Sequence, residues 1–272
     1  MSPLTAGELV DLAAAELGVP ARPTTVDGVV AGDPSAVVRG VAVTTLATLE
    51  VLERAVAAGA NVVVTHEPLF YDHLGAADAE LEAERDPVHA AKRAFLADHG
   101  IVVWRQHDAW HDRRPDGVDE GAARALGWTL DPAEAARGTA VADVGPTTLG
   151  ELAAHAARAL DARALRFVGD PALPVRRAAL DLGFRGFARN RRLLRRDDVD
   201  AVLVGEAHEW ETGSYATDAA RVLGTGLVVV GHVPSEQAGM RFFADRLRDV
   251  VARRAPDVDV AFLATPDAYA TP

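Results

Sequence analysis

Residues Asn61 to Tyr71 read NVVVTHEPLFY, and the apolar run Val62 to Val64 within them stops abruptly at polar residues. A short run of β-branched residues that is closed by a proline, here Pro68, predicts a buried strand. In open α/β sheets, ligands bind just beyond the carboxyl ends of the strands. The adjacent His66 and Glu67 are therefore candidates for a functional site.

Three further apolar runs end on polar residues in a similar manner: residues 101–105 (IVVWR), 200–204 (DAVLV) and 227–230 (LVVV). The residues that follow them are, run by run, His107 and His111; Glu206, His208 and Glu209; His232 and Glu236. Two residues four apart lie on the same side of a helical turn, so each four-spaced pair can point in one direction.

The remaining chain predicts strands that alternate with helices, and hence an α/β fold. Thr5–Glu8 and Thr148–Glu151 fit the capping box that opens a helix, and Pro87 suits the first position of another. We expect residues 20–33 to form a loop, residues 211–223 a helix, and Ser235 to cap a long helix that reaches Arg254.

The two halves of the chain resemble each other in pattern. Each has a strand followed by His or Glu residues, then a helix, then a strand followed by a four-spaced pair. This predicts two similar α/β lobes, residues 1–130 and 131–272, which we expect to face each other across a metal-binding cleft.

Composition narrows the class of protein. The 272 residues are 49% apolar and 25% charged, and cysteine is absent, which excludes disulfides and thiolate metal sites. A net charge of −12 disfavours binding to nucleic acid or to anionic membranes. Neither a secretory signal nor a membrane-spanning run is visible, so we expect a cytoplasmic protein.

The polar strand ends suit metal binding. Imidazole is a ligand for Zn, Mn, Fe and Ni, while carboxylates supply the charge needed to hold two cations close together. Six residues form the predicted set of metal ligands: His66, Glu67, His107, His111, His232 and Glu236. Spacing by itself leaves open both a metal site and a group of hydrogen-bonded structural histidines.

For the other histidines, aromatic residues and arginines, the sequence favours structural roles over functional ones. We assign His73, His89, His99 and His155 to hydrogen-bonded or surface positions. Packing is favoured over substrate stacking for the aromatic residues Phe70, Tyr71, Trp110 and Trp210, and outer-shell or acid/base roles for Glu206, His208 and Glu209 remain open. The arginine-rich residues 185–196 predict a solvated helix with local ion pairs rather than a phosphate site.

Three motifs give the chain a resemblance to a known family. LEVLERAVAAGANVVVTHEPLF is similar to a helix and strand that end in Thr-His-His-Pro-Leu-Phe, and His107 to His111 is similar to His-Thr-x-Leu-Asp. Residues 231–240 match Gly-His-x-x-x-Glu-x-x-Gly-Met at every defined position. These motifs resemble those of the Nif-three-like family, also called GTP cyclohydrolase 1 type 2 homologues or dinuclear metal centre hexameric proteins, in its short form.

The resemblance implies ligand roles for His66, His107, His232 and Glu236. Two positions depart from the family pattern, because Glu67 stands at the second histidine and His111 at the aspartate. One imidazole has become a carboxylate and one carboxylate an imidazole, so the inventory of ligands is preserved. We expect a retained site for two divalent ions, in which Glu67 acts in place of the aspartate.

The resemblance implies a metal-dependent hydrolase that uses metal-activated water, acts on a nucleotide or other heterocycle, and assembles as a homohexamer. Glu236 and Glu67 are the predicted catalytic carboxylates, with Glu236 as bridging ligand or proton acceptor. The alternative is a metal-binding protein without catalysis, such as a metal chaperone or an interaction scaffold. The small-molecule substrate is not identified by these motifs.

Overall fold

The computed structural model describes residues 2–269 and divides the chain into two compact units, each with its own five-stranded sheet. The first unit comprises Met1–Arg113 and Met240–Thr265, and the second Arg114–Gly239 and Pro266–Pro272. The division differs from the expected lobes of residues 1–130 and 131–272, because residues 114–130 belong to the second unit and residues 240–265, which include a strand of the first sheet, belong to the first. Among the described helices, none combines the length and apolar character needed to cross a membrane.

The first unit is a mixed sheet with helices on both faces. Its strands are β1 (Gly28–Ala31), β2 (Gly40–Thr44), β3 (Val62–Thr65), β4 (Val102–Arg105) and β10 (Asp259–Phe262). Its helices are α1 (Ala6–Leu17), α2 (Leu49–Ala57), α3 (Ala76–Glu84), α4 (Pro87–Asp98), α5 (Asp108–Asp112) and the part of α11 (His232–Arg254) from Met240 onward.

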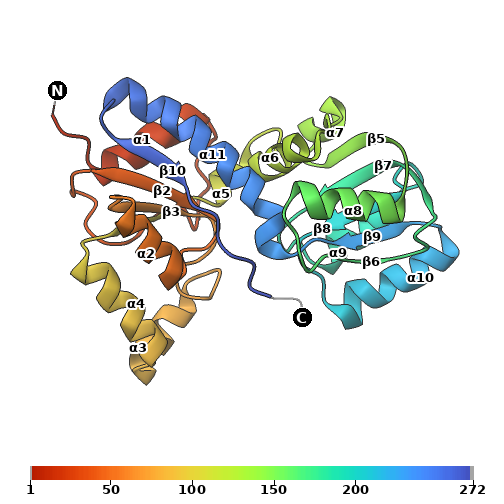
Figure 1. Cartoon of the computed structure of the whole chain (residues 1–272), viewed down its shortest axis with the longest axis horizontal. Coiled ribbons are helices and arrows are strands. Elements are labelled where there is room, and N and C mark those ends of the chain that lie inside the picture. The colour runs from red at the N-terminus through yellow and green to blue at the C-terminus, as the bar shows by residue number, and fades with distance from the viewer. Residues whose placement is uncertain (1, 270–272) are drawn as a thin grey trace. The chain divides into compact units, whose positions relative to one another are not determined.

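The strand order of the first sheet is β1-β4-β3-β2-β10, with β10, β2, β3 and β4 parallel. In Figure 1 the blue β10 lies beside the orange β2, although they come from opposite ends of the chain. The loop expected for residues 20–33 is wrong where β1 forms. This four-residue strand pairs antiparallel with β4 at the edge of the sheet and is too short to show a clear apolar pattern.

Successive side chains of a strand point to opposite faces of the sheet, so the core of the first unit lies on both faces. Val63 and Val103 pack with Leu52 of α2 and Leu96 of α4 in one buried cluster. Trp104, one residue after Val103, points the other way and contacts Phe243 of α11, with 5.9 Å between ring centroids. Figure 1 shows α1 and α11 on one side of this sheet and α2 with α4 on the other.

The second unit also carries helices on both faces of its sheet. Its strands are β5 (Ala140–Thr148), β6 (Arg166–Val168), β7 (Pro174–Asp181), β8 (Ala201–Val204) and β9 (Gly226–Val229). Its helices are α6 (Gly117–Leu126), α7 (Pro132–Ala136), α8 (Leu149–Ala159), α9 (Phe187–Leu194), the π-helical turn η1 (Glu209–Gly213), α10 (Ser214–Val222) and the start of α11.

In the second sheet, ordered β5-β7-β8-β9-β6, the three central strands are parallel and both edges are antiparallel. Val202 and Leu227 pack with residues of α9 and α10 on one face. On the other face α8 approaches closely at Gly226, where an added Cβ would lie 2.6 Å from Leu149. The glycine therefore allows the helix to pack directly against β9.

Local sequence signals predicted several helix starts and missed one. The capping boxes of Thr5 with Glu8 and of Thr148 with Glu151 are both present, and Pro87 opens α4. The predicted cap at Ser235 is wrong, because α11 already begins at His232. The helix expected over residues 211–223 is present, but residues 211–213 lie in the π-helical turn η1 and the α-helix α10 begins only at Ser214.

Candidate metal centre

The parallel register of β3 and β4 places the predicted ligands of the first unit together. Thr65 and Arg105, the last residues of the two strands, are register partners. The Gln106 amide donates to the Thr65 carbonyl at 2.9 Å, so the ladder extends one step beyond the strands. His66 and His107 therefore leave the same edge of the sheet at neighbouring positions.

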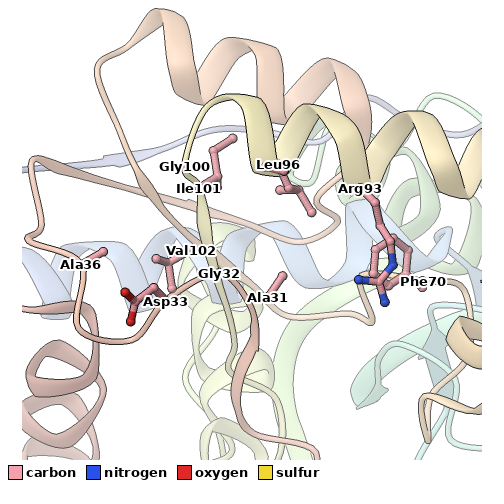
Figure 2. Close-up of a pocket in the computed structure, with 11 residues that line it drawn as sticks. Ala31, Gly32, Asp33, Ala36, Phe70, Arg93, Leu96, Gly100, Ile101 and Val102 are labelled. Carbon is pink, nitrogen blue, oxygen red and sulfur yellow. The ribbon is translucent and has the colours of Figure 1, made fainter.

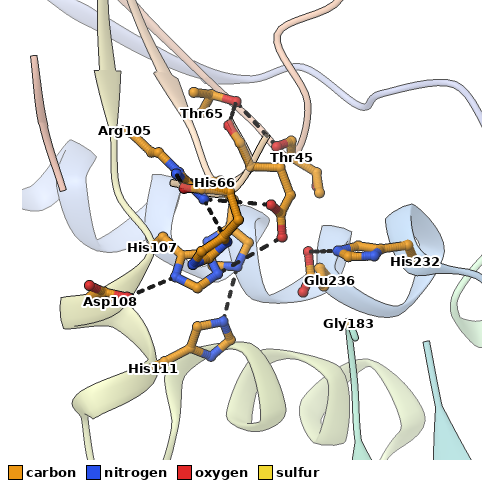
Figure 3. A network of polar contacts seen from close by, with 12 residues as sticks. Thr45, Thr65, His66, Arg105, His107, Asp108, His111, Gly183, His232 and Glu236 are labelled. Atoms are coloured by element: carbon orange, nitrogen blue, oxygen red, sulfur yellow. Dashed lines mark hydrogen bonds and ion pairs between the residues drawn. The ribbon is translucent and has the colours of Figure 1, made fainter. Parts of the chain in front are cut away.

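Three imidazole rings converge at this edge, as Figure 3 shows. Ring centroids of His66 and His107 lie 4.6 Å apart, and those of His107 and His111 lie 4.7 Å apart. The Nε2 atoms of His66 and His111 approach to 3.2 Å. His107 and His111 span the short helix α5, where the His111 amide donates to the His107 carbonyl, so the four-residue spacing works as predicted.

Hydrogen bonds at Nδ1 orient two of these rings as ligands. The Nδ1 of His66 lies 2.9 Å from the Gln106 carbonyl oxygen, and the Nδ1 of His107 lies 3.1 Å from the Asp108 carboxylate. Carbonyl and carboxylate oxygens only accept, so each Nδ1 carries the proton and each Nε2 presents a lone pair. Histidines that bind metals are held in this way.

Burial keeps the His107 ring neutral. Desolvation, and then the neighbouring rings of His66 and His111, lower the pKa of His107 to about 2. Burial opposes ionisation of Asp108, but hydrogen bonds from His107, Val26 and Thr25 lower the pKa of its carboxyl. The pair is therefore a neutral imidazole beside a carboxylate, which raises the basicity of the ligand nitrogen.

A residue from the segment expected to be a loop supports this cluster. Asp27 accepts from the amides of His107, Asp108 and Ala109 at 2.6, 2.8 and 2.8 Å and so occupies the start of α5. Arg22 pairs with Asp108 at 2.9 Å. No local signal marks Asp27, because its partners are some 80 residues away in the sequence.

Glu67 lies beside the imidazoles and is nearly buried, with 9% of its surface exposed. One carboxylate oxygen is 3.9 Å from Nε2 of His107, and the other is 3.7 Å from the guanidinium of Arg105. The chain turns after Thr65, so adjacent His66 and Glu67 can serve one cluster instead of opposite faces of a strand. Arg105 is a second neighbour that sequence reasoning missed.

His73 is closer to this cluster than predicted. A ring nitrogen of His73, a carboxylate oxygen of Glu67 and a ring nitrogen of His107 all lie within 4.8 Å of one another. Sequence reasoning placed His73 with the structural histidines because no strand end or four-residue spacing marks it. His89, His99 and His155 do have the expected hydrogen-bonding partners, which are Asp78, the Phe95 carbonyl and the Leu126 carbonyl.

In the second unit, His232 and Glu236 form the other predicted pair at the start of α11. The Nε2 of His232 lies 3.3 Å from the Glu236 carboxylate, which is 2% exposed. Gly183, just after β7, makes room for this carboxylate, since an added Cβ would lie 2.2 Å from Oε1 of Glu236. Gly183 also has a φ of +68°, so two independent constraints favour glycine there.

Two residues contact His232, one at its ring and one at its carbonyl group. Glu206, which follows β8, lies 3.3 Å from Nδ1 of His232, in keeping with an outer-shell role. Ser235 donates to the His232 carbonyl at 2.7 Å and accepts from the Gly183 amide at 3.1 Å. Ser235 therefore links the helix start to the end of β7, in place of the capping role predicted for it.

The arginine-rich segment is a helix, α9, but it is less solvated than predicted. Arg185 donates to Asp116 at 2.9 Å, and Arg189 pairs with Asp181, whose side chain is fully buried. The expected local ion pairing holds for Arg196, which pairs with Asp198. Arginines of this segment thus compensate buried carboxylates of the second unit.

Packing accounts for two of the four aromatic residues, as predicted. Phe70 belongs to the buried core of the first unit, and Trp110 is fully buried against Phe243. Tyr71 and Trp210 are 60% and 77% exposed.

A cavity of about 430 Å³ lies elsewhere in the first unit (Figure 2). Ala31 and Gly32 at the end of β1 line it together with Phe70, Arg93 and Leu96. Its described lining includes none of the six predicted ligands. The cavity is mostly apolar, so the chemistry of metal binding belongs to the histidine cluster and not to this pocket.

The structure brings His66, Glu67, His107 and His111 together within the first unit, and His232 and Glu236 together within the second. The donor chemistry fits a divalent metal, because neutral imidazoles present lone pairs and a carboxylate lies beside them. In the second unit, Glu236 adds a carboxylate, which occupies the space beside Gly183.

Comparisons with known proteins agree with this architecture. Staphylococcus aureus protein SA1388 has a TM-score of 0.78 at 19% identity, over 99% of this chain and 100% of that chain. A Bacillus cereus protein related to NIF3 gives 0.77 at 16% identity over all of both chains. Protein ybgI, described as of unknown function, gives 0.72 at 21% identity over 98% of this chain and 100% of that one.

At these identities the structural likeness shows a shared fold and carries no activity with it. No curated protein matches the chain. The family model of Duf34/NIF3 (NGG1p interacting factor 3) matches residues 21–268, which includes every predicted ligand. The chain therefore belongs to the Duf34/NIF3 family.

Proposed function

We propose that this chain is a metal-dependent hydrolase with a site for two divalent ions and that it acts on a nucleotide or another heterocyclic small molecule. The observation that carries the proposal is the convergence of His66, His107 and His111, with two Nδ1 atoms engaged by acceptors. One ligand atom of each of the three histidines lies within 4.8 Å of the other two, which is close enough for the rings to hold a single ion.

The six predicted ligands divide into two sets in this proposal. His66, Glu67, His107 and His111 supply three imidazoles and one carboxylate, and His232 with Glu236 adds one of each. That both sets serve one dinuclear centre rests on the family resemblance and on their donor chemistry. Without thiolates, imidazole and carboxylate donors favour Zn, Mn, Fe or Ni.

A divalent ion bound by these donors would supply Lewis acidity and lower the pKa of bound water. The protein's own part is to hold the ligands, remove a proton and neutralise charge. Glu236 is the proposed proton acceptor, since its carboxylate is buried beside Gly183. Glu67 would serve as a metal ligand in place of the aspartate of the family pattern, and Arg105 beside it limits the local negative charge.

Elemental analysis of the purified protein tests the metal site. We expect about two divalent ions per chain, a clear loss in a Glu67→Ala, His111→Ala double variant, and no change in a His99→Ala control. His99 is an exposed histidine whose ring is bonded to its own helix, so its loss should leave the site intact. Equal metal content in the wild type and the double variant would contradict the proposed ligand set.

Turnover separates the enzyme from the competing function. GTP, other nucleotides and phosphoesters form the substrate panel, and hydrolysis that disappears in His232→Ala but persists in His99→Ala supports the enzyme. Stable metal content without turnover on any of these substrates would instead identify a metal-binding protein that lacks catalysis.

Two further expectations belong to the same proposal. The family resemblance implies a homohexamer, and light scattering after size-exclusion chromatography should give about six times the chain mass of 28.7 kDa. A cytoplasmic location is part of the same proposal, and fractionation of cells that express the protein checks it.

A further inference from the structure

His73 lies on the loop that follows residues 61–71, beside the cluster of His66, His107 and His111. Its ring centroid is 4.8 Å from that of His107, with the rings nearly perpendicular. His66 is fully buried, whereas His73 is exposed and can be reached by a solute. Proximity alone would make His73 a fourth imidazole ligand.

The hydrogen bonds of His73 have the opposite polarity to those of the ligand histidines. The guanidinium of Arg105 lies 3.1 Å from Nδ1 of His73 through one nitrogen and donates to the His73 carbonyl at 2.7 Å through another. Arginine remains protonated and has no acceptor atom. The Nδ1 of His73 must therefore accept, which places the ring proton on Nε2.

This tautomer excludes His73 as a metal ligand. Its Nδ1 lone pair is engaged by Arg105, and its Nε2 carries a hydrogen, so the neutral ring has no lone pair left to offer. His66 and His107 are the reverse, because Nδ1 is the donor in each and Nε2 carries the lone pair. One cluster thus contains two kinds of histidine, distinguished by their partners and not by their distance from the centre.

We propose that His73 binds an oxyanion of the substrate, a phosphate or carboxylate group, through its Nε2–H, and that Arg105 positions it. The inference rests on the proposed metal site, because the His73 ring lies beside the histidines proposed as its ligands. Arg105 is itself buried and also donates to the His66 carbonyl at 3.3 Å. It therefore connects the end of β3 to the loop that carries His73.

Calorimetric titration of the Co²⁺-loaded full-length protein with inorganic phosphate tests this role. We expect His73→Ala to weaken phosphate binding roughly 10-fold or more, the usual effect of losing one hydrogen bond to a charged group. The Co²⁺ affinity, measured separately with the metal alone, should change less than about twofold. His73→Phe keeps a ring without the N–H and should show the same loss of phosphate affinity.

His73→Gln is the matched rescue variant. Its amide oxygen can accept from Arg105 while its amide nitrogen donates to the anion, so we expect phosphate affinity within about threefold of the wild type. His99→Ala controls for the loss of an exposed histidine. Acetate titrated in parallel distinguishes the two anion classes, because the tighter of the two identifies a phosphoryl or a carboxylate substrate group.

Each contrary result has a distinct meaning. Unchanged phosphate affinity in both His73→Ala and His73→Phe overturns the inference, as does a wild type that binds Co²⁺ but neither anion. A drop in Co²⁺ affinity for His73→Ala as large as that for His107→Ala would make His73 a ligand and also overturn it. A wild type that binds no Co²⁺ overturns the proposed function itself.

Discussion

The histidine cluster of the first unit and the His232–Glu236 pair of the second place similar donors by different means. The cluster needs two parallel strands in register and a short helix, and its ligands are up to 45 residues apart in the sequence. The His232–Glu236 pair is formed by residues one turn apart on α11, and Gly183 leaves the space that the Glu236 carboxylate occupies. The first arrangement therefore depends on long-range packing, and the second largely on local helix geometry.

The two arrangements also differ in how their histidines are held. Asp108, the partner of His107, has an 8% exposed side chain, whereas Glu206, the partner of His232, is 53% exposed. Hydrogen bonds to a buried charge persist, while exposed partners compete with water and are screened by salt. Mutations of matching residues in the two units should consequently have unequal effects.

Removal of a converging imidazole should have the largest effect. We expect His107→Ala to lower Zn²⁺ affinity more than about 100-fold, beyond the range for outer-shell changes, as measured by chelator competition. His232→Ala should retain one tightly bound ion, because the three-histidine cluster remains. If the two variants lose metal equally, the units do not differ as described. His155→Ala, which removes a structural histidine, is the control.

Gly183→Ala tests whether the Glu236 carboxylate of the second unit requires the space beside Gly183. The added Cβ meets Glu236 at 2.2 Å in a left-handed backbone, so we expect a loss of about 2–3 kcal/mol in the free energy of unfolding in urea. Gly127→Ala is the matched control, since it has a similar φ but open space, and should cost about 1 kcal/mol. Equal losses would show that Glu236 moves aside freely.

Asp108→Asn tests the buried support of the first unit. We expect a 10- to 100-fold loss of Zn²⁺ affinity, because the amide is a weaker acceptor for His107 and does not stabilise the ligand electrostatically. Asp112→Asn is the control, as Asp112 pairs with the same Arg22 but does not contact His107. A comparable loss in both variants would assign the effect to Arg22.

Glu206→Gln should have the smallest effect. Because Glu206 is more than half exposed, we expect less than about a threefold change in Zn²⁺ affinity by the same competition titration. Glu209→Gln, which removes an exposed partner of Arg166, provides the baseline. A loss as large as that in Asp108→Asn would remove the contrast between the two units.

Much of the architecture could be predicted from local patterns. Short β-branched runs predicted the central strands, since a buried strand requires apolar residues on both faces. Capping boxes at Thr5 and Thr148 located two helix starts. The edge strand β1 was missed because an edge needs few apolar residues, and the start of α11 was misplaced because Gly231 and His232 carry no side-chain cap signal.

The residue types and spacings in the sequence were sufficient to identify six candidate ligands and the family. They could not reveal Asp27, Arg105 or the polarity of His73, because these roles arise from contacts between segments distant in the sequence. A tautomer depends on which atom faces each ring nitrogen, and that is a property of packing. Sequence thus determined which donors exist, while tertiary contacts determined which of them can accept a metal and which can donate a proton.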